Sequence, residues 1–185
     1  MRSPSVTPAV LLSLLFGVAS LSWSLLGLLL PFVIPYSAAY SPALLVEIGG
    51  HFLFGLAAGA ATGRLAPALL AGLEAVLIDS DHLMAVAGLP VDARLSHSLL
   101  FVLLSSFLIS RVGRKAFALS SYGIMAVTLA SFLTHLAYDI AFGDGVFPLF
   151  FPLSTGVNDL PYVAWPILEV GAVCLCLLAR RCWDS

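Results

Sequence analysis

Histidines and acids that could bind a metal fall within the apolar stretches of this chain. Ionisable side chains inside such stretches are costly in a membrane, and they mark function by default. Neutral imidazoles combined with carboxylates suit Zn²⁺, and also Mn²⁺ or Fe²⁺. The residue types therefore predict a buried site for a divalent metal. The candidate ligands are His51, Asp79, His82, His97, His135 and Asp139, with Glu47, Glu74, Asp81 and Glu169 in the same kind of surroundings.

The spacing of these residues supports a shared site. Residues three or four positions apart lie on one face of a helix, and three pairs have this spacing: Glu47 and His51, Asp79 and His82, His135 and Asp139. Asp81 would lie about 200° round a regular helix from Asp79. We therefore expect Asp81 to bind a second metal, act as a base or hydrogen-bond to a ligand, unless the helix breaks there.

The composition predicts the elements that carry these residues. The chain is 61% hydrophobic and 10% charged, whereas about a quarter of the residues in a soluble domain are charged. Its mean hydropathy is +1.06, and its apolar runs approach the roughly 20 residues that cross a bilayer. We predict an all-α, polytopic transmembrane bundle that forms a single domain over residues 1–185. Its six spans are Pro8–Leu30, Pro42–Gly63, Ala66–Gly88, Leu95–Ser110, Lys115–Phe142 and Pro161–Leu178.

The positive charges orient this bundle. Of the eight Lys and Arg residues, all except Arg94 fall on one side of the six-span arrangement. Lys and Arg concentrate in cytoplasmic loops, so both termini are expected in the cytoplasm. The loop over residues 143–160 holds Asp144 and Asp159 without Lys or Arg, and is expected outside. At 1.5 Å per residue, each histidine then lies within roughly 15 Å of the outer surface.

Three segments resemble the motifs of a known family. Ile78–His82 (IDSDH), Leu95–Leu99 (LSHSL) and Thr134–Asp139 (THLAYD) resemble the P-D-x-D-H, T-H-S-L and H-x-x-x-D motifs of the YdjM-like family of membrane-bound, metal-dependent hydrolases. Ile78 stands where the first motif has proline. Phe147–Pro152 resembles the aromatic, proline-rich segment that follows the last motif. More distantly, the family resembles zinc-dependent phospholipase C and related zinc-dependent nucleases, which implies phosphoester hydrolysis.

These observations together predict a membrane hydrolase. The candidate ligands would bind one or more metal ions, most simply Zn²⁺, and Asp81 or Glu47 would serve as the general base. Arg94 would bind a phosphate or a lipid headgroup, and Tyr138 and Ser98 would orient ligands. The shallow depth of the site indicates a lipid or lipid-linked phosphoester as substrate, at the non-cytoplasmic side of the plasma or inner membrane. Phe147, Phe150 and Phe151 are expected at the interface, either as a cover of the site or as a lipid contact.

Other interpretations of the same residues remain open. The chain could be a metal-ion or small-solute transporter, or a structural membrane protein that a metal site holds together. Acyl or peptide hydrolysis is an alternative to phosphoester hydrolysis.

A net charge of −2 without a basic patch argues against a nucleic-acid partner. Cys174, Cys176 and Cys182 lack metal-site spacing, and Gly55, Gly59 and Gly63 are predicted to allow close helix packing.

Overall fold

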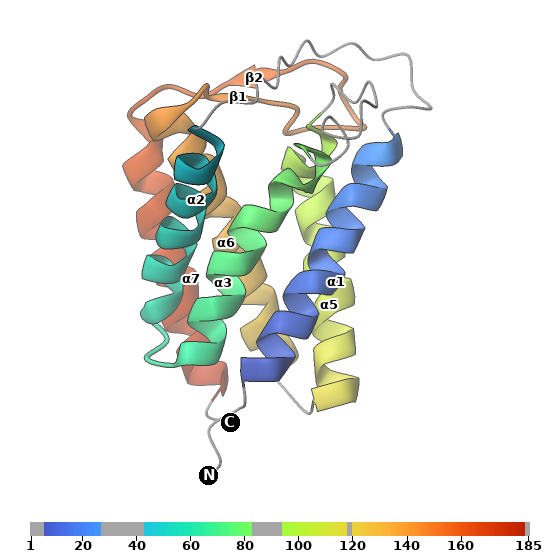
Figure 1. The fold of residues 1–185 in the computed structure, drawn as a ribbon, viewed down its shortest axis with the longest axis vertical. Helices are drawn as coiled ribbons and strands as arrows, with labels where there is room; N and C mark the ends of the chain where they lie inside the picture. Colours follow the sequence, from blue (N-terminus) through green and yellow to red (C-terminus); the bar gives the residue numbers. More distant parts are fainter. Residues whose placement is uncertain (1–5, 27–42, 83–93, 118–119, 184–185) are drawn as a thin grey trace.

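The protein is described by a computed structural model covering residues 6–26, 43–82, 94–117 and 120–183. Within these residues the chain is all-α apart from two short strands, as predicted from the composition (Figure 1). The α-helices are α1 (Val6–Leu25), α2 (Ala43–Ala60), α3 (Leu65–Leu77), α5 (Leu99–Phe117), α6 (Ser121–Phe142) and α7 (Ala164–Trp183). The shorter elements are the 3₁₀ helices η2 (Ile78–Asp81) and η3 (Leu95–His97) and the strands β1 (Val146–Phe147) and β2 (Asn158–Asp159).

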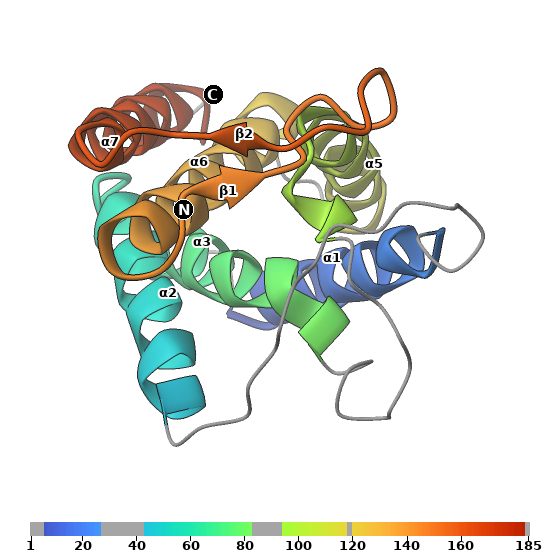
Figure 2. The same cartoon turned by 90° about the horizontal axis from the view of Figure 1, so that it is seen from above.

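The α-helices form two layers, which are visible from above (Figure 2). One layer holds α2, α3 and α1 side by side, and the other holds α7, α6 and α5. The central helices α3 and α6 pack on each other across the layers. Apolar side chains of α1, α3, α5 and α6 fill the core, and Phe16, Leu70 and Phe132 are among its most buried members. The antiparallel strands β1 and β2 lie over one end of the bundle.

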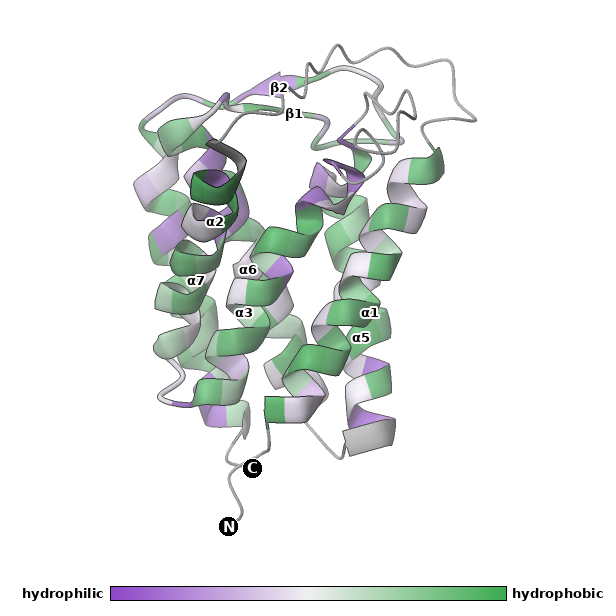
Figure 3. Ribbon diagram, in the orientation of Figure 1, coloured by the Kyte–Doolittle hydropathy of each residue, from purple (hydrophilic) through white to green (hydrophobic). Residues whose placement is uncertain are grey.

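The helices are apolar along most of their length (Figure 3). Among the described residues, two helices are long and apolar enough to cross a membrane, namely α1 and α6, and Leu45–Ala60 in α2 is a shorter apolar helix. The outer faces also expose large apolar side chains, such as Val18 at 62% and Leu108 at 58%. The predicted span ends at 27–30 and 83–88 lie outside the described residues.

The third predicted span is wrong in its course. It was expected as one helix from Ala66 to Gly88, but α3 ends at Leu77 and the chain tightens into η2. Asp79 leaves helical geometry there, with φ −81° and ψ 21°. The Ser80 hydroxyl donates to the carbonyls of Leu77 (2.7 Å) and Gly17 (3.1 Å). Because a serine hydroxyl competes for backbone carbonyls, it favours such a break.

The starts of the next two helices also differ from the prediction. The helix expected from Leu95 begins as α5 at Leu99, since Ser98 has extended φ/ψ and accepts a hydrogen bond from the Phe101 N–H (3.3 Å). Ser98 therefore caps the start of α5. The helix expected from Lys115 begins as α6 at Ser121, and Lys115 belongs to the last turn of α5.

Glycine brings α2 against α3. A Cβ at Gly55 would lie 2.5 Å from the Ala71 carbonyl oxygen, and a Cβ at Gly59 would lie 2.7 Å from the Ala68 Cα. The predicted close packing is thus confirmed for these two glycines. It is wrong for Gly63, which has φ +72° in the turn after α2, where glycine is favoured for its conformation.

Candidate metal centre

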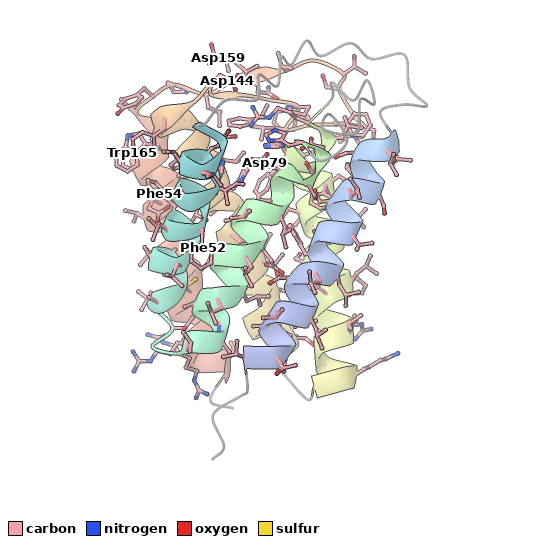
Figure 4. All side chains as sticks on the ribbon, in the orientation of Figure 1. Phe52, Phe54, Asp79, Asp144, Asp159 and Trp165 are labelled. Atoms are coloured by element: carbon pink, nitrogen blue, oxygen red, sulfur yellow. The ribbon has the colours of Figure 1, made fainter. Side chains whose placement is uncertain are left out.

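Residues from four separate segments converge at the end of the bundle under β1 and β2. His51 comes from α2, Asp79 from η2, His97 from η3, and His135 and Asp139 from α6. Figure 4 shows Asp79 at this end, with Asp144 and Asp159 beyond it. Their nitrogen and oxygen atoms form groups lying within 4.8 Å of one another, which could hold a metal ion. Asp79 lies in η2, directly after the break that ends α3.

The distances describe one compact cluster. The Nε2 atoms of His97 and His135 are 2.8 Å apart. Asp79 Oδ1 lies 3.2 Å from the first of these nitrogens and 3.5 Å from the second. On the other side, Asp139 Oδ2 lies 3.4 Å from His135 Nε2. His51 Nε2 lies 3.3 Å from Asp139 Oδ1 and 3.4 Å from Asp79 Oδ2. Two carboxylates and three imidazoles thus face one small volume.

The hydrogen bonds on the far side of two rings fix their tautomers. His135 Nδ1 lies 2.7 Å from the carbonyl oxygen of Ala75, and His97 Nδ1 lies 3.2 Å from the carbonyl oxygen of Arg94. A carbonyl only accepts, so each Nδ1 carries a proton and the Nε2 of each neutral ring presents a lone pair. Metal-binding histidines are commonly oriented by such a bond. The Nε2 lone pairs of His97 and His135 therefore face the same small volume as the oxygens of Asp79 and Asp139, where a metal ion could bind both kinds of atom.

Aromatic contacts fix the positions of the imidazoles. The His51 ring stacks on the His135 ring, with centroids 4.1 Å apart and an interplanar angle of 11°. Tyr138 lies against His51 at 4.5 Å between centroids. Phe147 stacks on His97 at 5.8 Å and is fully buried. Phe147 therefore covers the site, which is one of the two expected roles, and is not a lipid contact.

The other two aromatic residues of that loop differ from each other. Phe151 is buried against Trp23, with centroids 6.4 Å apart, so it is not a lipid contact either. Phe150 is 50% exposed and agrees with the prediction. The segment after α6 therefore closes over the cluster chiefly through buried rings.

Arg94 lies inside the centre. It has left-handed backbone geometry, with φ 32° and ψ 37°, and its guanidinium forms a buried ion pair with Asp139. It also contacts Asp144 Oδ1 at 2.9 Å and His97 Nε2 at 3.2 Å. Phe147 lies beneath the guanidinium, with its centroid 5.4 Å away. Asp144 was not predicted as part of the site. Its position in a loop that has no Lys or Arg of its own could have indicated an ion pair with Arg94.

A second group of ligands extends the cluster along η2. Asp79, Asp81 and His82 bring ligand atoms within 4.8 Å of one another, and His82 Nε2 lies 3.9 Å from Asp79 Oδ1. The helix breaks at η2, as the prediction for Asp81 required if it was to share a metal with Asp79. Glu47 forms a further group with His51 and Asp139. Every predicted metal ligand, and both predicted bases, thus lies in or beside the centre.

The chemistry of the cluster fits a divalent cation. Among the described residues, His51 Nε2, Asp79 Oδ1 and Asp81 Oδ1 are buried without a hydrogen-bond partner. A buried carboxylate is costly unless a cation or hydrogen bonds compensate it. Of the aspartates Asp79, Asp81 and Asp139, Arg94 forms its ion pair with Asp139. A metal ion would neutralise the remaining charge and occupy the lone pairs that now face one another.

Two further predicted acids do not join the centre. Glu74 is fully buried between α3 and α6, and Ser131 donates a hydrogen bond to its Oε2 at 3.3 Å. This contact agrees with the role of a hydrogen-bonded structural acid. Glu169 lies on α7, outside each of the ligand groups found among the described residues. Neither residue connects the centre to the opposite end of the bundle.

The comparisons agree with the predicted resemblance. The family model described as YdjM inner membrane protein matches residues 46–183, a range that includes every residue of the candidate centre. Neither a curated protein nor a solved structure matches the chain.

Proposed function

Because the chain belongs to the YdjM inner membrane protein family, we propose that it is a membrane-embedded, metal-dependent hydrolase of a lipid or lipid-linked phosphoester. The supporting observation is the convergence of His51, Asp79, His97, His135 and Asp139 in one buried cluster whose ligand atoms face a common volume. Ligand sets of imidazole and carboxylate favour Zn²⁺, with Mn²⁺ or Fe²⁺ as alternatives.

We further propose that all six α-helices cross the membrane and that the centre lies on the non-cytoplasmic side. The start of α1 and the end of α7 lie at the end of the bundle opposite to β1 and β2 (Figure 1). The basic residues in the last turns of α5 and α7, Arg114, Lys115, Arg180 and Arg181, belong to that same end. This distribution supports a cytoplasmic position for the end remote from the centre.

Cysteine labelling in spheroplasts tests this orientation. In a variant with Cys174, Cys176 and Cys182 replaced by alanine, a Gly156→Cys change lies in an exposed turn of the 143–160 loop. A membrane-impermeant maleimide is expected to label it before lysis. The matched Arg111→Cys change, toward the other end, is expected to react only after lysis. The reverse pattern would place the centre on the cytoplasmic side.

The residues of the centre divide the chemical work. A bound Zn²⁺ would supply an acidified water and would polarise a phosphoryl oxygen. His97 and His135 would hold the ion through Nε2 atoms whose orientation the Arg94 and Ala75 carbonyls fix. Arg94 can contact a phosphate with the edge it now turns to Asp144, because that aspartate is 60% exposed and replaceable. Asp81 Oδ1 is free to accept the proton of the attacking water.

We expect Asp81 to be the general base, with Glu47 as the alternative. Asp81 is 4% exposed and makes no hydrogen bond through Oδ1 to the described residues, whereas Glu47 is partly exposed. An Asp81→Asn change should lower kcat by about 100-fold or more with zinc content unchanged. Glu47→Gln is the matched control and should retain most activity. The assay is phosphate release from phosphatidic acid and from a prenyl phosphate by zinc-loaded protein.

This assay also separates the competing functions. Unchanged hydrolysis in both variants would contradict a carboxylate base at either position. Zinc uptake into proteoliposomes without hydrolysis of any phosphoester would indicate a transporter. Loss of folding on zinc removal, again without hydrolysis, would indicate a structural metal site.

A further inference from the structure

An apolar groove lies beside the metal centre, between α1 and α2, with α3 as its floor. Its volume is about 390 Å³, near the lower end of the roughly 300–1,000 Å³ typical of ligand pockets. The Ser13 hydroxyl in its wall donates to the Ala9 carbonyl at 2.9 Å, so it offers no free donor. The groove is lined by Val10, Ser13, Leu14, Ile48, Gly49, Phe52, Leu73, Val76 and Leu77. Such a lining suits a hydrocarbon chain and provides nothing for a polar ligand.

The groove opens through an apolar outer surface. Its wall residues Leu14, Ile48 and Val10 are 56%, 40% and 38% exposed. Next to them on α2, Leu45 and Leu53 are 78% and 61% exposed. A protein of an inner membrane family turns such a surface to lipid. A chain can therefore enter the groove sideways from the bilayer without crossing water.

The floor of the groove leads to the metal centre. Leu73 and Val76 are three residues apart on α3 and share a face of that helix, and Asp79 follows three residues later, in η2. On the α2 wall, Ile48 and Phe52 flank the ligand His51. Asp79 has 11% of its side chain exposed, whereas His97 and His135 are fully buried. Asp79 is thus more accessible than these two histidines, and it follows the lining residue Leu77 by two positions. In Figure 4, Phe52, another lining residue, lies below Asp79.

We propose that this groove holds one hydrocarbon chain of the substrate lipid, with the phosphate headgroup at the metal centre. The inference rests on the proposed function and adds the site for the tail. It assigns substrate selection to α1, α2 and α3, and it requires a phosphoester attached to at least one long chain. Short, water-soluble phosphoesters would lack the contacts that position the headgroup.

Gly49 allows the groove to be filled without disturbing the fold. Among the described residues, a Cβ at this position would meet nothing within 4 Å, so Gly49→Leu adds its side chain without a clash with them. A matched control is Gly171→Leu on α7, where a Cβ would make an ordinary contact of 3.5 Å with Leu133. Both changes add the same side chain to a helix, and only the first obstructs the groove.

The probes are phosphatidic acid with a diazirine on one acyl chain and geranylgeranyl phosphate with a diazirine on its chain, each in phosphatidylcholine vesicles. Mass spectrometry should find the label on residues 10–14, 48–52 and 73–77. Gly49→Leu should reduce this labelling about fivefold, equivalent to about 1 kcal/mol of packing, and Gly171→Leu should not. The two probes distinguish an acyl from a prenyl chain.

Equal labelling of α5 and α7, or labelling unaffected by Gly49→Leu, would overturn the proposal. Zinc content is measured on the same samples and is expected to stay unchanged in both variants. If Gly49→Leu retains zinc while the label is spread evenly, the tail site fails and the metal centre stands. If the protein binds no zinc while groove labelling persists, the proposed hydrolase fails and the lipid-binding groove stands.

Discussion

Replacing His135 with alanine is expected to remove nearly all zinc from the purified protein. Its Nε2 lies within 3.5 Å of both central carboxylates, and the residue belongs to two of the ligand groups. Loss of a partner that merely orients a ligand typically costs about 10- to 100-fold in metal affinity. Loss of the ligand itself should weaken zinc binding by about 100-fold or more. Elemental analysis and competition with a chelating dye measure this change.

Two further variants keep the test decisive. His135 is fully buried, so alanine leaves a cavity, whereas Asp139→Asn keeps the shape, removes the charge and leaves Arg94 its ion pair with Asp144. Both should lose zinc while circular dichroism shows the helices retained. His82→Ala is the control, since its Nε2 is 3.9 Å from the nearest carboxylate oxygen of Asp79, and its loss should be about tenfold or less. Full zinc content in both His135→Ala and Asp139→Asn would contradict the metal centre.

Replacing Arg94 with glutamine is expected to make the fold depend on zinc. The side chains of Arg94 and Asp139 are 6% and 5% exposed, and removing one partner of a buried pair costs about 3–5 kcal/mol because the other charge is left uncompensated. A cation beside Asp139 compensates the same charge. Thermal unfolding in detergent should therefore show a large loss of stability with chelator present, and recovery of most of it with excess zinc.

Asp144→Asn is the matched control for the outer half of this interaction. Asp144 is 60% exposed, and a pair screened by solvent contributes about 1 kcal/mol or less. The unfolding temperature of the Asp144→Asn variant should hardly differ from that of the unchanged protein, with or without zinc. If Arg94→Gln loses the same stability in chelator and in zinc, the arginine and the metal do not neutralise the same carboxylate.

Much of the candidate metal centre could be predicted from helix periodicity. The four-residue spacing of His135 and Asp139 survives because α6 is regular from Ser121 to Phe142. Depth within the bundle was predictable for the same reason, since a regular helix converts residue number into height. The all-α class was predicted from the composition, because few charged residues and long apolar runs are typical of membrane-spanning helices.

The breaks at η2 and η3 were not predictable in this way. They depend on partners far away in sequence, such as Gly17, whose carbonyl accepts from Ser80. The left-handed Arg94 is held by Asp139 and Asp144, which lie 45 and 50 positions further along. Hydropathy and local spacing carry no record of these contacts. The same limit explains why the burial of Phe147 on His97 was missed.

The first helix, α1, holds the segment that carries Asp79, although none of the candidate ligands belongs to it. Ser20 of α1 donates to the Ile78 carbonyl at 2.7 Å, and the Gly17 carbonyl accepts from Ser80, so both residues flanking Asp79 are tied to α1. The family match covers residues 46–183 and leaves this helix out. A fragment starting at residue 46 would keep every ligand, yet nothing from α1 would anchor the segment that presents Asp79. The part of the chain that the family model matches thus depends on the preceding helix for the position of Asp79.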